Sequence, residues 1–340
     1  MSKIHSIAVD IGSGYSKSIL LPASGQVDDM RKLVKSFKTA VGPSRQVTLQ
    51  PGVKPLTVEF EDKSFFVAST AEVALSVEQR TNTLSANWAY EDGYRALVYY
   101  IIAKALTSEG VEPSETPIRI RLITGLPQAY YEGGAEKVRN MYSGAHRFRH
   151  AGQAWVLDLV DVEVVPQAMG AFYSATETLL SDEESEERVG VIDIGTYTTD
   201  FCLSEDVQYH AYESGGVPIG VSTLVASLKT VLERDLGFMY TDDSLKKAFE
   251  RKTVLVRSES QNIAAQIEEV VTQAGRTLQK ALPKSWDTNT MYLVLAGGGG
   301  AEYFFGEFFQ KEYPHIKIIT SPENAIVLGY AIYGSALDTQ

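Results

Sequence analysis

The chain has 340 residues, of which 44% are hydrophobic and 22% are charged, and its formal net charge is −12. This length accommodates two domains with cores of their own, and the composition excludes a disordered or fibrous protein. The acidic balance disfavours direct binding of nucleic acid, because phosphate neutralisation needs a basic surface. The sequence also shows no secretion signal, no apolar run long enough to cross a membrane and a single cysteine, Cys202. We therefore expect a cytoplasmic protein without membrane contact.

A short unit occurs twice, because residues 9–20 return as residues 192–203 with matching Asp, Ile, Gly, Ser/Thr and Leu positions. Each copy begins with an apolar, β-branched run, breaks at a glycine and resumes an apolar run, which predicts a β-hairpin. The turns contain small and polar residues, whose backbone can approach a bound anion closely. The sequence therefore predicts two anion-cradling hairpins, one headed by Asp10 and one by Asp193.

The segments outside the hairpins alternate between strand and helix patterns, so both halves read as mixed α and β structure. The expected elements are short strands within 47–68, a helix at 92–107, strands at 118–125 and 162–165, a helix at 167–180, an acidic solvated linker at 181–187, helices at 221–232 and 261–281, a strand at 291–295 and a helix at 323–333. The densest basic cluster contains Arg147 and Arg149, flanked by His146 and His150, and we interpret it as a solvated loop with an exposed histidine pair.

Asp10 and Asp193 are the strongest candidate site residues. An ionised carboxylate at the end of a buried strand needs a compensating cation, and a hydrated magnesium ion would provide one. The alternative is that each Asp caps its own turn. Lys17, on the returning strand of the first hairpin, could reach a phosphate, or it could be a solvent-facing strand lysine. The matching position of the second hairpin is Asp200, so the two hairpins are chemically unequal.

Three further features complete the candidate site. The glycine run 297–300 follows an apolar strand and could admit a nucleotide, although a flexible surface loop is the alternative. Gln167 begins a helix and could position an attacking water, although a helix-start glutamine without a role is common. The helices near 168–175 and 325–334 carry small residues that permit a close crossing, as a hinge or as simple core packing.

These pieces, in this order, resemble the actin-like ATPase superfamily. The shared motifs are two phosphate hairpins (9–20 and 189–203), two connecting helices (162–175 and 323–336) and an adenosine motif (293–304). Within the superfamily the chain looks most like the ParM group of bacterial plasmid-segregation actins, in its length and in the segments 123–127 and 216–222.

The resemblance implies an α/β, duplicated two-domain fold of the actin-like (ribonuclease H-like) type with a nucleotide cleft between the domains. Domain I would comprise residues 1–188 together with the returning helix 323–340, and domain II residues 189–322. The implied ligands are ATP or GTP and Mg²⁺.

The resemblance also assigns residue roles. Asp10 and Asp193 would serve the metal and catalysis, and Lys17 would touch the phosphates. Gln167 stands where ParM-like proteins usually carry Glu, so it would orient water and not act as a base. The remaining contacts would come from Gly12, Ser13, Gly14, Tyr15, Gly195, Thr196, Tyr197 and Thr198 at the phosphates, and from Gly297, Gly298 and Gly299 at the adenosine.

The implied function is an ATPase that polymerises into filaments with ATP and segregates plasmid DNA through a DNA-binding adaptor protein. The alternative is a non-polymerising ATPase of the same superfamily that acts as an assembly scaffold or a chaperone-like switch. A small-molecule kinase is a third possibility, although 340 residues leave little room for a sugar-binding insert.

Overall fold

The computed structural model describes residues 3–22, 25–47, 52, 54–83, 85, 87–297 and 304–337. Its contacts divide the chain into two compact units, residues 1–174 with 326–340 and residues 175–325. Each unit has its own sheet and hydrophobic core, and both are mixed α/β, as predicted. Domain boundaries at 188 and 323 stay a prediction. No helix within the described ranges is long and apolar enough to span a membrane.

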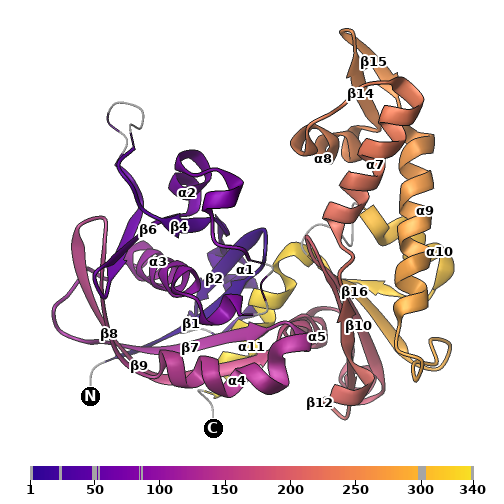
Figure 1. Cartoon of the computed structure of the whole chain (residues 1–340). Coiled ribbons are helices and arrows are strands. Elements are labelled where there is room, and N and C mark those ends of the chain that lie inside the picture. Colours follow the sequence, from indigo (N-terminus) through magenta and orange to yellow (C-terminus); the bar gives the residue numbers. More distant parts are fainter. Residues whose placement is uncertain are drawn as a thin grey trace. The chain divides into compact units, whose positions relative to one another are not determined.

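The first unit is built on a nine-stranded sheet in the order β3-β2-β1-β7-β9-β8-β5-β6-β4 (Figure 1). β1 is parallel to β7 and β7 is parallel to β9, whereas the other neighbours are antiparallel. The strands are β1 (Ile4–Ile11), β2 (Tyr15–Leu20), β3 (Lys35–Lys38), β4 (Val41–Pro43), β5 (Thr57–Phe60), β6 (Lys63–Val67), β7 (Ile118–Leu126), β8 (Gly144–His150) and β9 (Gln153–Pro166).

Strand β1 is buried on both faces because helices cover both sides of the sheet. Its side chains alternate between the faces. Ile7 and Val9 therefore join the core around α3 (Asp92–Ser108), and Ala8 joins the core around α11 (Ala325–Leu337). The unit's other helices are α1 (Val27–Leu33), α2 (Ala68–Ala74), α4 (Gln128–Tyr142) and the start of α5 (Gln167–Thr178). The helix predicted at 92–107 and the strand predicted at 118–125 are thus confirmed.

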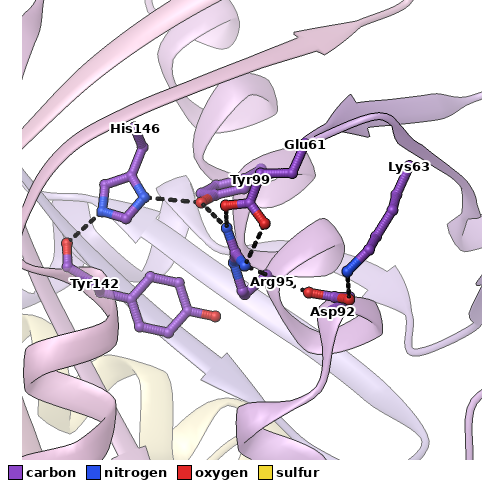
Figure 2. Close-up of polar contacts among 7 residues, drawn as sticks. All are labelled: Glu61, Lys63, Asp92, Arg95, Tyr99, Tyr142 and His146. Carbon is purple, nitrogen blue, oxygen red and sulfur yellow. Dashed lines mark hydrogen bonds and ion pairs between the residues drawn. The ribbon is translucent and has the colours of Figure 1, made fainter.

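The basic segment forms strand β8, so its interpretation as a solvated loop is wrong. Arg147 and Arg149 point to solvent, but His150 is buried and His146 is half-buried. Figure 2 shows His146 between two partners. Its Nε2–H donates to the Tyr142 carbonyl oxygen at 2.8 Å, and its Nδ1 accepts from the Tyr99 hydroxyl at 2.8 Å. The histidines are therefore part of the core and are not an exposed pair.

The second unit has a smaller sheet in the order β12-β11-β10-β16-β17, with β13 paired to β11, and a separate hairpin of β14 and β15 (Figure 1). β10 is parallel to β16 and antiparallel to β11. The strands are β10 (Val189–Ile194), β11 (Thr199–Glu205), β12 (Gln208–Tyr209), β13 (Gly215–Val217), β14 (Thr253–Val256), β15 (Glu259–Asn262), β16 (Tyr292–Ala296) and β17 (Lys317–Ile318).

The helices of the second unit, apart from α6, contribute apolar side chains to one core with Ile192 and Ile194 of this sheet. They are α6 (Asp182–Glu186), α7 (Val221–Leu236), α8 (Asp242–Arg251), α9 (Ala264–Ala281) and α10 (Gly306–Glu312). The helix predicted at 221–232 is confirmed, and the helix predicted at 261–281 is confirmed from Ala264 on, because Gln261 and Asn262 belong to β15. The acidic segment 181–187 is largely exposed, as predicted, but it is a helix and not a linker, because Ser181 caps α6 and Glu184 forms a 2.7 Å ion pair with Lys317.

Candidate functional site

The carboxylate of Asp10 lies at the end of β1 and is only 3% exposed. Its Oδ1 accepts a 2.8 Å hydrogen bond from Nε2 of Gln167, the first residue of α5. Its Oδ2 lies 3.7 Å from Nζ of Lys17, which faces it in register on β2. Lys17 is itself buried, so it is not a solvent-facing strand lysine. A carboxylate, a cation and an amide therefore meet in one desolvated cluster, where each compensates the burial of another.

Two further buried polar residues lie near this cluster and were missed by the sequence reasoning. The Thr124 hydroxyl donates to the Val9 carbonyl oxygen at 2.9 Å and so ties β7 to β1 one residue before Asp10. Burial raises the pKa of Tyr94, and the charge of Asp10 raises it further. Tyr94 therefore stays a neutral hydroxyl. The signal for Thr124 was its position at the end of a strand, but Tyr94 lies within an apolar helix pattern that gave none.

The turn after Asp10 is held by two threonines from distant segments. The Thr39 hydroxyl donates to the Gly12 carbonyl oxygen at 2.6 Å, and the Thr39 amide donates to the Gly14 carbonyl oxygen at 3.1 Å. The Thr83 hydroxyl donates to the Ser13 carbonyl oxygen at 3.3 Å. All three carbonyl groups of this turn are thus engaged with protein.

Tyr15 closes the first turn but sends its side chain outward. It is 47% exposed, and Nζ of Lys38 lies 4.5 Å from its ring centroid. Hydrogen bonding to Tyr15 is the main reason that the pKa of Lys38 is raised. Tyr15 is one of the residues predicted to touch an anion, and it can do so through its backbone and not through its ring.

The second hairpin repeats the construction with different charges. Asp193 is the penultimate residue of β10 and pairs in register with Asp200 on β11, as Asp10 pairs with Lys17. Both carboxylates are 5% exposed. The prediction that the two hairpins are chemically unequal is confirmed, because the cation of the first is replaced by a carboxylate in the second.

The turn of the second hairpin is closed by its own backbone. The Gly195 amide donates to the Thr198 carbonyl oxygen at 2.8 Å. Thr196 is half-buried, whereas Tyr197 and Thr198 are exposed. The turn therefore presents small backbone groups, flanked by an exposed ring at Tyr197.

Gly297 follows β16 and packs directly on the backbone of Ile194, at the end of β10. A Cβ on Gly297 would overlap the backbone of Ile194, and its φ of +126° is one that L side chains rarely adopt. Only glycine fits both conditions. Gly298 and Gly299, also predicted at the adenosine, lie outside the described residues.

Helix α5, which carries Gln167, crosses α11 at two glycines. A Cβ on Gly329 would lie 2.6 Å from the carbonyl carbon of Gly170 and 3.0 Å from its Cα. A Cβ on Gly170 would in turn lie 2.7 Å from Cε1 of Tyr330, which is fully buried. The small residues therefore permit a close helix crossing, three residues after Gln167.

Each unit supplies a carboxylate of the kind that can bind a magnesium ion together with phosphates. Among the described residues, no group of three or more His, Cys, Asp or Glu side chains is arranged to hold a metal ion. Mg²⁺ is commonly bound through one or two carboxylates together with substrate phosphates and water. Asp10 and Asp193 each supply a buried carboxylate of this kind.

Two mixed α/β units, each with an antiparallel hairpin whose first strand ends in a buried Asp before a glycine-containing turn, define an actin-like fold. The family model for the N-terminal domain of actin-like proteins matches residues 8–170. The model for the C-terminal domain of archaeal, MreB-like actin homologues matches residues 191–310. The chain belongs to the actin-like ATPase superfamily, which includes ParM-like members.

Solved structures share this fold over nearly the whole chain. Ta0583, an archaeal actin homologue, matches with a TM-score of 0.76 and 17% identity over 98% of this chain and 100% of its own. ParM from Clostridium botulinum, solved as a 15-stranded filament, gives 0.69 and 18% over 99% and 100%. Bacillus thuringiensis ParM with AMPPNP gives 0.71 and 15% over 99% of each chain. No curated protein shows significant sequence similarity to the chain.

Proposed function

We propose that the chain binds ATP together with Mg²⁺ and hydrolyses it. The observation that carries this proposal is the buried cluster of Asp10, Lys17 and Gln167 at the head of the first turn. Buried groups of this kind are costly to a fold and gather at functional sites. Further support comes from two relatives, because Ta0583 has also been solved with ADP and a ParM with AMPPNP.

The roles follow from the chemistry of each group. Lys17 contributes a point charge toward the phosphates, and Asp10 and Asp193 would hold the magnesium ion. When bound, that ion neutralises the charge of the phosphates. The backbone amides of turns 12–15 and 195–198 donate to phosphate oxygens, and the glycines from Gly297 to Gly299 admit the adenosine.

Gln167 orients the attacking water. Its Nε2 is committed to Asp10, so its Oε1 is left to accept a hydrogen bond from a water molecule. A neutral amide takes no proton at ordinary pH, and Gln167 is therefore not a general base. The Asp10 contact fixes the amide's direction, as a water-positioning residue requires.

Phosphate release with Mg²⁺ tests the proposal, with ATP and GTP compared. The variant Asp193→Asn keeps the size of the side chain and removes its charge, and we expect hydrolysis to fall by about 100-fold, as when a charge-stabilising group is lost elsewhere. Asp182→Asn, on the exposed α6, makes the same chemical change and should leave hydrolysis unchanged. Full activity in Asp193→Asn would remove Asp193 from the site, and an inactive wild-type protein would refute hydrolysis altogether.

The proposal extends to filaments. The chain polymerises with ATP, hydrolysis weakens the polymer, and a DNA-binding adaptor protein connects it to plasmid DNA. The filament structure of the Clostridium botulinum ParM supports self-association, and the net charge of −12 supports an adaptor in place of direct DNA contact. Both observations support a function like that of the ParM group.

Sedimentation with ATP against ADP tests polymerisation. We expect pelleting with ATP at micromolar concentrations and much less with ADP. If the protein binds and hydrolyses ATP but stays monomeric well above that range, the filament part is wrong. A nucleotide-dependent capture of a partner protein would then favour a scaffold or a chaperone-like switch.

A further inference from the structure

Three successive carbonyl groups of the first turn accept hydrogen bonds from threonines of distant segments. In a trans peptide the C=O of one residue and the N–H of the next point in opposite directions. Because Thr39 and Thr83 bind the carbonyl oxygens of Gly12, Ser13 and Gly14, the following amides point away from these threonines. Within the described part of the chain, the amides of Ser13 and Gly14 donate to no protein acceptor.

The Thr39 hydroxyl is the centre of a short relay. Its oxygen lies 2.8 Å from the Ser16 hydroxyl and 2.6 Å from the Gly12 carbonyl oxygen. A carbonyl group can only accept, so Thr39 donates to Gly12 and must accept from Ser16. Ser16 is fully buried and Thr39 is 9% exposed. Removing the Thr39 hydroxyl would therefore leave both a donor and an acceptor without a partner.

The second turn fixes the same two positions by another means. The carbonyl oxygens of Gly195 and Thr196 correspond to those of Gly12 and Ser13. They accept hydrogen bonds from the Val221 and Ser222 amides at 3.1 and 2.8 Å. Val221 and Ser222 are the first residues of α7. In both turns these two carbonyl oxygens accept hydrogen bonds from the protein. The donors are threonine side chains in the first turn and backbone amides in the second.

We infer that Thr39, assisted by Thr83, is a positioning residue that holds the amides of the first turn toward the nucleotide's phosphates. This role rests on the proposed nucleotide binding. Thr39 need not touch the nucleotide, because it acts on the other edge of the same peptide groups. Its amide and its hydroxyl hold two carbonyl groups of one turn, so it limits rotation of the peptides between them.

Binding of a fluorescent ADP analogue with Mg²⁺ tests this inference. Thr39→Val keeps the shape of the side chain and deletes the hydroxyl, and we expect affinity to fall about tenfold, because the Ser16 hydroxyl and the Gly12 carbonyl group both lose their partner. Thr39→Ser restores the hydroxyl and should return affinity to within about twofold of wild type. Thr83→Val should have a smaller effect, because its hydrogen bond is 3.3 Å long.

The matched control is Thr70→Val. Thr70 is also buried in the first unit, and its hydroxyl oxygen accepts from the amide of Leu56, a residue outside the turn, at 2.9 Å. It should lose thermal stability as Thr39→Val does while keeping nucleotide affinity. The inference is overturned if Thr39→Val binds like wild type, if Thr39→Ser fails to rescue, or if Thr70→Val weakens binding equally. A wild-type protein that binds no nucleotide would instead refute the proposed function, and the positioning role with it.

Discussion

Replacing a helical glycine by alanine should destabilise the protein at Gly329, where α5 and α11 cross, and stabilise it at Gly133 in α4. In Gly329→Ala the new Cβ would overlap the carbonyl oxygen of Gly170 and lie 2.6 Å from its carbonyl carbon. Carbon atoms pack best at about 3.5–4.0 Å, so the helices must move apart by at least about 1 Å. Overpacking of this kind costs about 1–3 kcal/mol. Gly133, within α4, has nothing within 4 Å of its Cβ position, so Gly133→Ala should stabilise by about 0.5–1 kcal/mol.

Calorimetry measures the stability changes of the two variants, and phosphate release measures the effect of Gly329→Ala on hydrolysis. A loss of about 2 kcal/mol should lower the unfolding midpoint by about 4–8 °C in a unit of this size. Gly329→Ala should also slow hydrolysis, because a shift of α5 stretches the 2.8 Å bond from Gln167 to Asp10. If Gly329→Ala proves as stable as Gly133→Ala, the crossing tolerates a side chain and this reasoning is refuted.

Three further predictions follow from buried groups. Lys17→Met should destabilise the protein by about 3 kcal/mol in urea unfolding, because it leaves the Asp10 carboxylate without its cation. The double variant Lys17→Met/Asp10→Asn should recover most of this loss. If it recovers nothing, Lys17 and Asp10 do not form a buried pair. Burial lowers the pKa values of His146 and His150, so the unfolded chain binds more protons as pH falls through the ordinary histidine pKa. Stability should therefore decline below about pH 6.5, and the decline should be smaller in His150→Phe; an equal decline would assign it to other groups. Burial also raises the pKa of the Cys202 thiol, which should resist a thiol reagent until the protein is denatured; rapid labelling of the native protein would contradict this.

The hairpins were predictable because their signal is local. In each, a β-branched run, an Asp, a glycine and a second apolar run follow one another, and this order also sets the register that opposes Asp10 to Lys17 and Asp193 to Asp200. The long helices were predictable for the same reason, since their apolar periodicity persists for several turns.

The supports of the site were not predictable. Thr39, Thr83 and Tyr94 reach it from segments far along the chain, and a polar residue in a loop or an apolar helix carries no mark of a distant partner. The β8–β9 hairpin was missed because its turn uses Ala151 and Gly152, both at positive φ, and lacks the Asn-Gly or Asp-Gly pair of a recognisable hairpin turn.

The different supports of the two turns set different limits on sequence variation. The first turn can be loosened by any change that deletes the Thr39 hydroxyl. The second depends on backbone amides at Val221 and Ser222, which nearly every residue supplies. Proline is the exception because it lacks an N–H, although it is common at the first position of other helices. A saturation library should therefore accept many side chains at Ser222 and other apolar ones at the buried Val221, but proline at neither, and little besides serine at Thr39.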